Sequence, residues 1–360
     1  MRKLSIYVIG ALTAAVLVGC SNSDKITGPG TRADLAKTVW DSVGVFWMTT
    51  LDATNSDQYT YYSFSQRAAI DLTDDQAASS SDWDIAFKRS FIKTNGGVSG
   101  PADVKSVDLV QTGIALSDEF ASVTSADATQ LSQDQWMGDS YDVALDSLWK
   151  YNLLTHQLTA KQFVYVLSDA AGHYVKLQVL GSLDDQQPPM QGKMILKYFY
   201  QPTMDETSLV GAAEVDTVDA PNGFYYDFSS GQIVSPANPM SSSDWDIYVK
   251  AYDFFLNSSI MGSGQVAAFA AYDGLADKTD FDGLTDVNQF GDIRWVQDEL
   301  SSAFTASDWF NYNDQTHSLT SKLHTYLVKV GDTTYKIEIV SYYDPDSGAS
   351  AVYTLHWVEL

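Results

Sequence analysis

Most hydrophobic positions along the chain fall in short runs rich in Val, Ile, Tyr and Phe, and several of these runs alternate with polar residues. Alternation over about four to eight residues is typical of a strand with one buried face. We expect strands at 162–168, 173–180, 194–200, 325–330, 335–341 and 351–358. Turn-forming pairs such as Ala171-Gly172 and Gly331-Asp332 separate consecutive runs. This order predicts two three-stranded meanders.

Helical periodicity is scarce outside the first twenty residues. The segments 34–42 and 298–304 are the best candidates for single short helices. The pattern as a whole predicts an all-β fold of antiparallel strands.

A long internal repeat divides the chain. Ser-Ser-Ser-Asp-Trp-Asp-Ile occurs at 79–85 and again at 241–247, and Thr-His-x-Leu-Thr occurs at 155–159 and 316–320. Tyr165 and Lys176 likewise match Tyr326 and Lys336. A period this long indicates a duplicated domain rather than a solenoid. We place copy one at 33–203 and copy two at 204–360, with the seam in the polar segment 201–222.

The first nineteen residues have the pattern of a secretory signal peptide. Arg2 and Lys3 precede an apolar run at 4–18, which is too short to span a bilayer. The run ends in Leu-Val-Gly-Cys, which resembles the bacterial lipobox. The resemblance implies that Cys20 becomes the lipidated first residue. The polar composition of 21–32, with Gly28-Pro29-Gly30, predicts a flexible tether, so that 20–32 comprises the lipidated cysteine and its tether. The alternative is an ordinary signal peptide with an incidental cysteine.

Ser21 follows the cysteine, where an Asp would be the usual signal for retention at the inner membrane. We therefore expect a lipoprotein of the outer membrane, on its periplasmic or its surface face. The lipid anchor is the only membrane contact that the sequence predicts.

Charge and composition exclude several classes of function. The chain has 46 Asp+Glu against 21 Lys+Arg, a formal charge of −25, which would repel the phosphates of a nucleic acid. Its 21 Tyr, 16 Phe and 9 Trp argue against a disordered acidic protein. A single cysteine excludes an intrachain disulfide and cysteine-based metal sites. The sequence contains no nucleophile elbow, zinc-protease or phosphate-loop motif, so we do not expect an enzyme.

The repeated motifs resemble those of the HmuY-like haem-binding lipoproteins of Bacteroidetes and related bacteria. Copy one carries Ser-Asp-Trp-Asp-Ile-Ala-Phe at 81–87, Lys-Thr-Asn-Gly-Gly at 93–97 and Thr-His-Gln-Leu-Thr at 155–159. Copy two keeps Ser-Asp-Trp-Asp-Ile at 243–247 but has Asn-Ser-Ser-Ile-Met at 257–261 in place of the glycine loop. The resemblance implies two tandem all-β domains, lipid anchorage, and capture of haem or a related porphyrin for delivery to an outer-membrane transporter.

Haem binding would require axial ligands from histidine, methionine or tyrosine, with no metal other than the haem iron. His156 and His317 occupy equivalent positions after an aromatic cluster and are the first candidates; the alternative is a turn histidine bound to the backbone. Met137, Met190 and Met261 lie in loops and are further candidates, although methionines usually fill gaps in a core. His173 and His324 have no counterpart in the other copy, so we interpret them as structural or solvent-exposed.

We interpret the repeated Trp-Asp pairs, Trp83-Asp84 and Trp245-Asp246, as core tryptophans, each followed by an aspartate that binds a neighbouring turn. Two other functions remain open. One is a structural or protein-interaction lipoprotein that has lost haem binding, for which the altered 257–261 loop would be a sign. The other is a module whose aromatic side chains stack on glycan rings.

Overall fold

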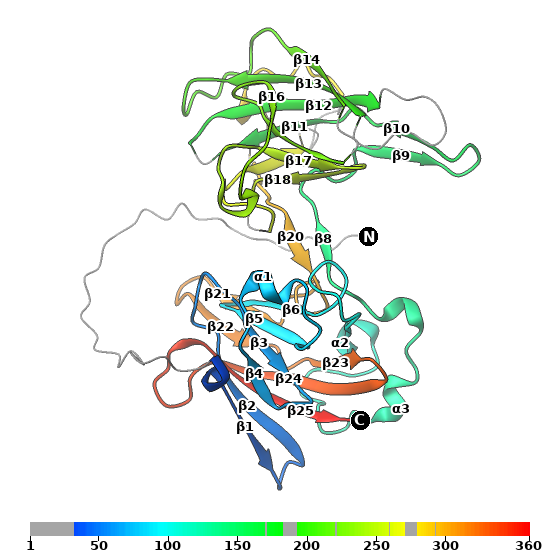
Figure 1. Ribbon diagram of the computed structural model, residues 1–360, viewed down its shortest axis with the longest axis vertical. Coiled ribbons are helices and arrows are strands. Elements are labelled where there is room, and N and C mark those ends of the chain that lie inside the picture. Colours follow the sequence, from blue (N-terminus) through cyan, green and yellow to red (C-terminus); the bar gives the residue numbers. More distant parts are fainter. Residues whose placement is uncertain are drawn as a thin grey trace. The chain divides into compact units, whose positions relative to one another are not determined.

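The computed structural model describes residues 32–169, 171–182, 193–219, 222–258, 260–270, 279–291 and 293–360 (Figure 1). Strands account for 43% of the structure and helices for 8%, and the sheets are antiparallel, which confirms the all-β prediction. Among the described residues, none of the helices has the length and apolar character needed to cross a bilayer. The signal peptide, Cys20 and most of the tether lie outside the described residues.

The chain folds into two compact units. Unit 1 contains the chain up to residue 140 together with 301–360, and unit 2 contains residues 141–300. The chain passes from one unit to the other twice, through strands β8 (Ser140–Asp142) and β20 (Glu299–Ser301), and these two crossing strands pair with each other.

The structure therefore divides the chain differently from the predicted boundary between 33–203 and 204–360, which falls inside unit 2. Each unit combines the N-terminal half of one copy with the C-terminal half of the other. Sequence similarity locates the two copies. It does not determine which halves pack together, because the C-terminal half of either copy has the residues needed to pack against the N-terminal half of either copy.

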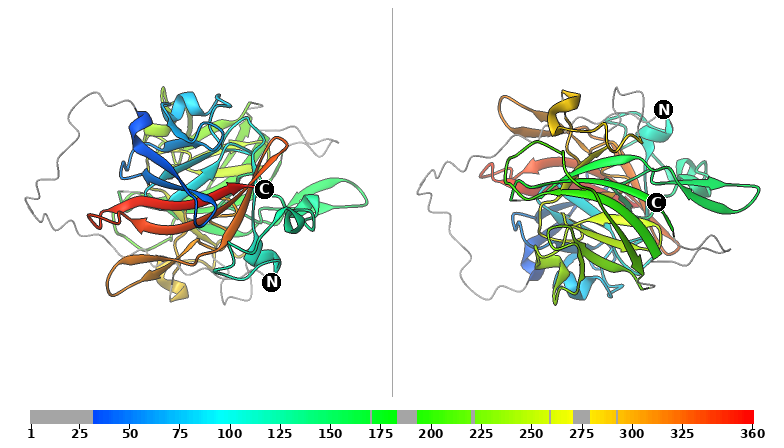
Figure 2. Two further views of the ribbon diagram at one scale, coloured as in Figure 1. Left: turned by 90° about the horizontal axis from the view of Figure 1, so that it is seen from below. Right: turned by 90° about the horizontal axis from the view of Figure 1, so that it is seen from above.

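Unit 1 contains two sheets and a hairpin. Its strands are β1 (Ala36–Asp41), β2 (Phe46–Asp52), β3 (Thr60–Ser63), β4 (Ala68–Ile70), β5 (Ile85–Lys88), β6 (Phe91–Thr94), β7 (Lys105–Asp108), β21 (Phe310–Asn313), β22 (Ser318–Ser321), β23 (Thr325–Val330), β24 (Thr333–Tyr343) and β25 (Ser350–Glu359). The larger sheet has the order β1-β2-β25-β24-β23-β7, the smaller has β4-β3-β5-β6, and β21 pairs only with β22. Figure 2 shows the first strands of the chain beside the last, as the β2–β25 pairing requires.

Unit 2 repeats this plan. Its strands are β9 (Trp149–Asn152), β10 (Gln157–Ala160), β11 (Val164–Ser168), β12 (Tyr174–Ser182), β13 (Lys193–Gln201), β14 (Glu214–Asp219), β15 (Phe224–Asp227), β16 (Gln232–Val234), β17 (Ile247–Lys250), β18 (Asp253–Leu256) and β19 (Ala267–Ala270). The larger sheet has the order β14-β13-β12-β11-β19 and the smaller has β16-β15-β17-β18. The two predicted meanders, β11-β12-β13 and β23-β24-β25, are both confirmed.

The helices of the described residues are all single turns. They are η1 (Arg32–Leu35), α1 (Asp74–Ala77), α2 (Leu109–Thr112), α3 (Ser125–Ala128), η2 (Gln133–Gln135), η3 (Pro239–Ser241) and η4 (Val287–Phe290). The two predicted helices are wrong. The segment 34–42 is mostly strand β1, where β-branched residues pair with β2, and 298–304 contains strand β20 followed by a turn. Pairing with a distant strand overrode the local pattern in both places.

Each unit has its own hydrophobic core, and the repeated Trp-Asp motif is part of it. Trp83 and Trp245 are 0% and 1% exposed, and each indole N–H donates to a main-chain carbonyl six residues earlier. Asp84 accepts the N–H of Phe64 at 2.7 Å, and Asp246 accepts that of Phe228 at 2.8 Å. The interpretation of these pairs as core residues that bind a neighbouring turn is confirmed.

A buried lysine in each unit joins halves that come from different copies. The Lys336 ammonium donates to the carbonyls of Phe120 and Val123 at 2.7 and 2.8 Å and lies 4.4 Å from the Phe120 ring centroid. Its counterpart Lys176 donates to two carbonyls of unit 2 and lies 4.4 Å from the ring of Phe281. Burial lowers the pKa of both lysines. In each unit, the same lysine contacts therefore join the half from one copy to the half from the other.

Candidate functional site

The two histidines singled out from the repeat lie at the ends of two equivalent hairpins, β9–β10 in unit 2 and β21–β22 in unit 1 (Figure 1). In each turn an asparagine side chain accepts the main-chain N–H groups two and three residues later. The distances are 2.9 and 3.2 Å for Asn152 and 2.9 and 3.0 Å for Asn313. His156 and His317 follow in the left-handed conformation, with φ of 55° and 53°, which returns the chain to the second strand.

Each of these histidines is held by a tyrosine of the preceding strand. His156 Nδ1 lies 2.7 Å from the Tyr151 hydroxyl, and His317 Nδ1 lies 2.6 Å from that of Tyr312. All four side chains are exposed. In the tautomer in which Nδ1–H donates to the phenol oxygen, Nε2 carries a lone pair that is available to a metal. A hydrogen bond at Nδ1 is also the usual way in which a protein orients a ligating imidazole.

The other three histidines are each close to a carboxylate. His173 lies 2.9 Å from Asp169, the buried His324 lies 2.8 Å from Asp108, and His356 lies 3.5 Å from Glu338. His356 also stacks on the ring of Phe46, with centroids 4.0 Å apart. These contacts tie the three imidazoles to the sheets that carry them. Of the five histidines, only His156 and His317 bind an uncharged group, a tyrosine hydroxyl, in an exposed hairpin.

The methionine candidates have different surroundings. Met137 is half-buried, and its backbone forms a bridge with Ser106. Met261 is half-buried in the turn after β18, where its N–H donates to the Ser258 carbonyl at 2.8 Å. Met190 lies outside the described residues. His156 and Met261 belong to unit 2, whereas His317 and Met137 belong to unit 1.

The loop with an altered sequence in copy two keeps one pair of hydrogen bonds. Asn95 donates to the carbonyls of Ser80 and Trp83 at 2.9 and 2.7 Å, and Asn257 makes the same two bonds to Ser242 and Trp245 at the same distances. The Asn-Ser-Ser-Ile-Met segment of copy two has therefore changed sequence around a preserved asparagine. The altered loop is not evidence that copy two has lost the family's core structure.

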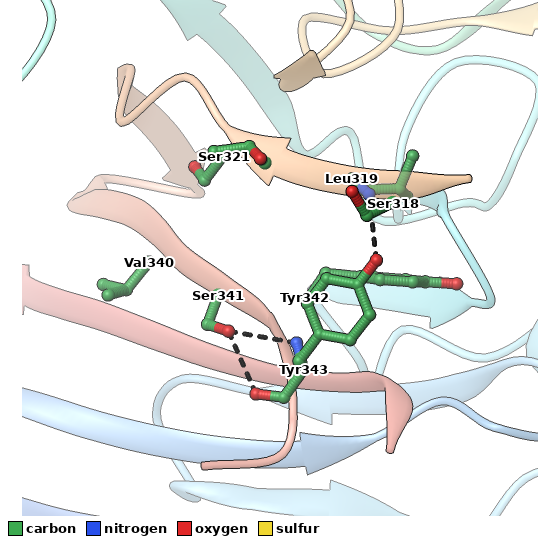
Figure 3. Close-up of a pocket in the computed structure, with 8 residues that line it drawn as sticks. Ser318, Leu319, Ser321, Val340, Ser341, Tyr342 and Tyr343 are labelled. Carbon is green, nitrogen blue, oxygen red and sulfur yellow. Dashed lines mark hydrogen bonds between the residues drawn. The ribbon is translucent and has the colours of Figure 1, made fainter. Parts of the chain in front are cut away.

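A pocket of about 330 Å³ lies beside the second hairpin, between β22 and β24 (Figure 3). Hydroxyl groups form much of its lining, and the Tyr343 hydroxyl accepts the N–H of Leu319 at 2.9 Å. Neither histidine nor methionine is among its lining residues. Ligand sites are more often apolar, with a few convergent polar groups, so this pocket alone does not suit a porphyrin.

Sequence reasoning missed several buried carboxyl groups that hold loops in place. Asp139 accepts two hydrogen bonds from Thr94, at 2.7 and 2.9 Å, and Asp298 accepts the N–H groups of Leu256 and Ala144 at 2.6 and 2.8 Å. Burial raises the pKa of Asp139 to about 6 and that of Asp298 to about 7. No local motif marks either residue. Within the described part of the chain, no cluster of three or more His, Cys, Asp or Glu could hold a metal ion.

The family model described as HmuY protein matches this chain twice, at residues 55–198 and 219–357. The chain belongs to the HmuY family. The family match and the antiparallel sheets together confirm the predicted fold class and the two HmuY-like copies. Each matched region contains one Ser-Asp-Trp-Asp-Ile motif and one hairpin histidine.

Solved structures of HmuY-like proteins cover most of the chain at low identity. A candidate HmuY-like haem-binding protein of Bacteroides vulgatus is 12% identical, with 88% of this chain and 93% of that chain covered and a TM-score of 0.30. The apo HmuY analogue of Tannerella forsythia is 10% identical, with 91% and 97% covered and a TM-score of 0.32. At such TM-scores the likeness does not define the fold, which rests on the family match and the strands. A search of curated proteins finds no match.

Proposed function

We propose that this HmuY-family protein is a lipid-anchored protein of the bacterial outer membrane that binds haem or a related porphyrin for uptake. The observation that carries the proposal is the Tyr-His pair, which recurs at the same place in both copies. In each pair the hydroxyl binds Nδ1 and leaves Nε2 for the iron. His156 and His317 would therefore hold the haem iron, one in each copy.

The residues around each histidine suit this ligand in chemistry. Haem iron accepts imidazole nitrogen, and the adjacent tyrosine supplies an aromatic ring with its centroid 6.1 Å from the imidazole in both hairpins. The tyrosines are positioning residues: each holds the ring orientation and the tautomer of its histidine. Met137, Met190 and Met261 remain second candidates for an axial position.

The two hairpins should differ in affinity. Haem carries two carboxylates, and an acidic protein surface repels them. Copy one has Lys150 next to Tyr151 and no acidic residue in its turn, whereas the turn of copy two contains the exposed Asp314. We expect the His156 hairpin to bind haem more tightly than the His317 hairpin.

The family supports the location and the route as well as the ligand. A lipid on Cys20 followed by the tether at 20–32 would hold the protein at the membrane, and an outer-membrane haem transporter would be the recipient. The alternative is a lipoprotein that keeps this fold and recognises a protein or a glycan instead.

A haem titration tests the proposal. Residues 21–360, which lack only the lipidated Cys20 of the mature protein, should give a saturating shift of the Soret band, and the stoichiometry counts the binding copies. His156→Ala should weaken binding more than His317→Ala, and the double variant should lose the shift. Tyr151→Phe should alter the band of the His156 site without abolishing it.

His173→Ala serves as the matched control, because His173 pairs with Asp169 and belongs to neither hairpin. An unchanged band in the double variant would remove both hairpin histidines from the site and direct attention to the methionines. No shift beyond that of a non-binding acidic protein would leave a family fold with another ligand.

A further inference from the structure

The tips of the two hairpins have the same backbone geometry, but one tip is apolar and the other is polar. Between the capping asparagine and the Thr-His pair, copy two has Asp314-Gln315, whereas copy one has Leu153-Leu154. The asparagine hydrogen bonds and the backbone conformation of the histidine agree in the two turns. Polar residues therefore form this turn as well as leucines do, so the turn itself does not require the leucines.

The two leucines are among the most exposed apolar side chains of the described chain. Leu153 is 78% exposed and Leu154 is 93% exposed, at the end of a hairpin that extends away from the strands of unit 2 (Figure 1). Tyr151 beside them is 50% exposed. Single exposed leucines are common on protein surfaces, but an adjacent pair at a projecting tip forms a small apolar point.

The charge around this tip also differs from that of the rest of the protein. From Ser147 to Ser168 the chain contains no Asp or Glu, although the whole chain carries a charge of −25. In the same stretch, Lys150 lies in β9 and Lys161 directly follows β10. A four-residue strand is about 13 Å long. That length exceeds the Debye length of about 8 Å at physiological salt, so the tip is screened from most of the acidic surface.

We propose that the β9–β10 hairpin inserts Leu153 and Leu154 into the interface of a lipid bilayer. The apolar pair enters the acyl boundary, while Tyr151 and Lys150 lie at the level of the head groups, where an aromatic ring and a lysine are both favourable. The hairpin is then a second membrane contact, separate from any lipid on Cys20. The inference does not depend on haem binding.

The shape and composition of the tip favour lipid over a protein partner. A stable protein interface buries about 800 Å² on each side, far more than two leucine side chains provide. Its energetic centre is usually Trp, Tyr or Arg, and leucine is under-represented there. A protruding pair of apolar side chains can insert into a bilayer without a groove of complementary shape.

Vesicle flotation with the mature chain from Ser21 to Leu360, made without acyl groups, tests the inference. This chain contains every described residue, and phosphatidylcholine vesicles at physiological salt avoid repulsion by anionic lipid. The wild type should float with the vesicles. Leu153→Asp with Leu154→Gln gives copy one the tip of copy two and should reduce partition roughly ten-fold or more. Asp314→Leu with Gln315→Leu should increase partition by adding a second apolar tip.

The depth of insertion can be measured at matched positions. Cys20 is the only cysteine, so residues 21–360 contain none. Thr155→Cys and Thr316→Cys place a unique thiol at equivalent, exposed positions of the two turns. A polarity-sensitive fluorophore on residue 155 should shift to the blue on addition of vesicles, and the same fluorophore on residue 316 should not.

Three results would overturn the inference: no flotation of the wild type, equal flotation of the Asp-Gln variant, or equal fluorophore shifts in the two hairpins. The Asp-Gln variant should still bind haem at His156, with an affinity no lower than that of the His317 hairpin, whose tip it copies. A variant that loses haem while floating as the wild type does would place the leucines in the haem site instead. Retained haem binding with lost flotation supports insertion even if the acyl anchor on Cys20 proves absent.

Discussion

Unit 1 and unit 2 are built from the same two kinds of half-domain, joined in opposite order along the chain. In unit 1 the N-terminal half comes first and the C-terminal half follows after an insertion; in unit 2 the C-terminal half comes first. The contacts between the halves are nevertheless equivalent. The Trp309 indole donates to the Ser90 carbonyl at 3.0 Å, and the Trp149 indole donates to that of Tyr252 at 2.9 Å.

Unit 2 therefore joins the C-terminal half of the first matched region to the N-terminal half of the second, which is the circularly permuted order, and unit 1 joins the other two halves across that insertion. This difference indicates that the fold requires two complementary halves, but does not require them to follow one another in a particular order along the chain. Circular permutation is tolerated where chain ends lie at accessible connections. In unit 2 the ends of the permuted order lie at the two crossings, 140–141 and 300–301, in strands β8 and β20.

The largest expected effect concerns which fragments fold. Residues 141–300 expressed alone should give a cooperative unfolding transition and a β-type circular dichroism spectrum, because they contain a complete unit. A chain in which 140 is joined to 301 through a short Gly-Ser linker should do the same for unit 1. If 141–300 were unstructured while 33–203 folded well, the halves would pair within copies and the exchange would be wrong.

Trp309→Ala should destabilise unit 1 by about 3–5 kcal/mol, since the side chain is 2% exposed and its loss leaves a large cavity. The residues that lose hydrogen-exchange protection should lie in 46–108, which belongs to copy one, although Trp309 belongs to copy two. Residues 224–256 of unit 2 serve as the internal control. Lost protection there, with 46–108 unchanged, would contradict the exchange.

The pH dependence of stability should separate the units further. Burial raises the pKa of Asp246 and of Asp298 in unit 2 to about 7, and that of Asp139 in unit 1 to about 6; it also raises the pKa of Asp84 in unit 1. A carboxyl group whose pKa is raised in the folded state stabilises the fold fully below its unfolded pKa, near 4, and this contribution is lost as pH rises through the folded value. Unit 2 should therefore lose more stability than unit 1 between pH 4 and 7, by a few kcal/mol at most.

Urea unfolding midpoints of 141–300 at pH 4.5, 6 and 7.5 measure this effect. Asp298→Asn should flatten the slope, and Asp282→Asn should leave it unchanged because Asp282 is 87% exposed. Unfolding midpoints that rise steadily over this pH range would show that these carboxyl groups are not buried as described.

The smallest effect concerns the hairpin turns. Asn152→Ala and Asn313→Ala should each destabilise their own hairpin by about 1 kcal/mol, because each removes an acceptor for two main-chain N–H groups. Hydrogen exchange of the turn amides should report equal losses, with the global unfolding midpoint unchanged. Unequal losses would mean that Leu153 and Leu154 do contribute to the turn.

Strand positions and core motifs could be predicted from the sequence because their signals are local. The runs of Val, Ile and Tyr in both meanders alternate as a half-buried strand should, and the Trp-Asp pair recurs with enough identity to mark a core. The helix predicted at 34–42 failed because β1 is defined by its pairing with β2 and not by its own periodicity. The Tyr-His contact was only partly visible, as a histidine after an aromatic cluster.

The exchange of halves could not be predicted from one sequence. Lys176 and Lys336 are equivalent residues, and Phe120 and Phe281 are equivalent partners, so either pairing satisfies the same chemistry. Whether a half packs with its own copy or with the other copy depends on where the chain leads after 140–141 and 300–301. No sequence motif distinguishes a connection that stays in one unit from a connection that passes to the other unit. The buried Asp139 and Asp298 were missed for a similar reason, since their partners are distant in sequence.

The two crossings also set the order in which the molecule can be completed as it is synthesised. Residues 33–140 emerge first, but their partner in unit 1, residues 301–360, emerges last. In between, residues 141–203 become available, and they carry the same complementary face. Pairing of 141–203 with 204–300 would remove this competitor before the chain ends. All of unit 2 is synthesised before unit 1 is complete, so unit 1 is the last unit that the nascent chain can close.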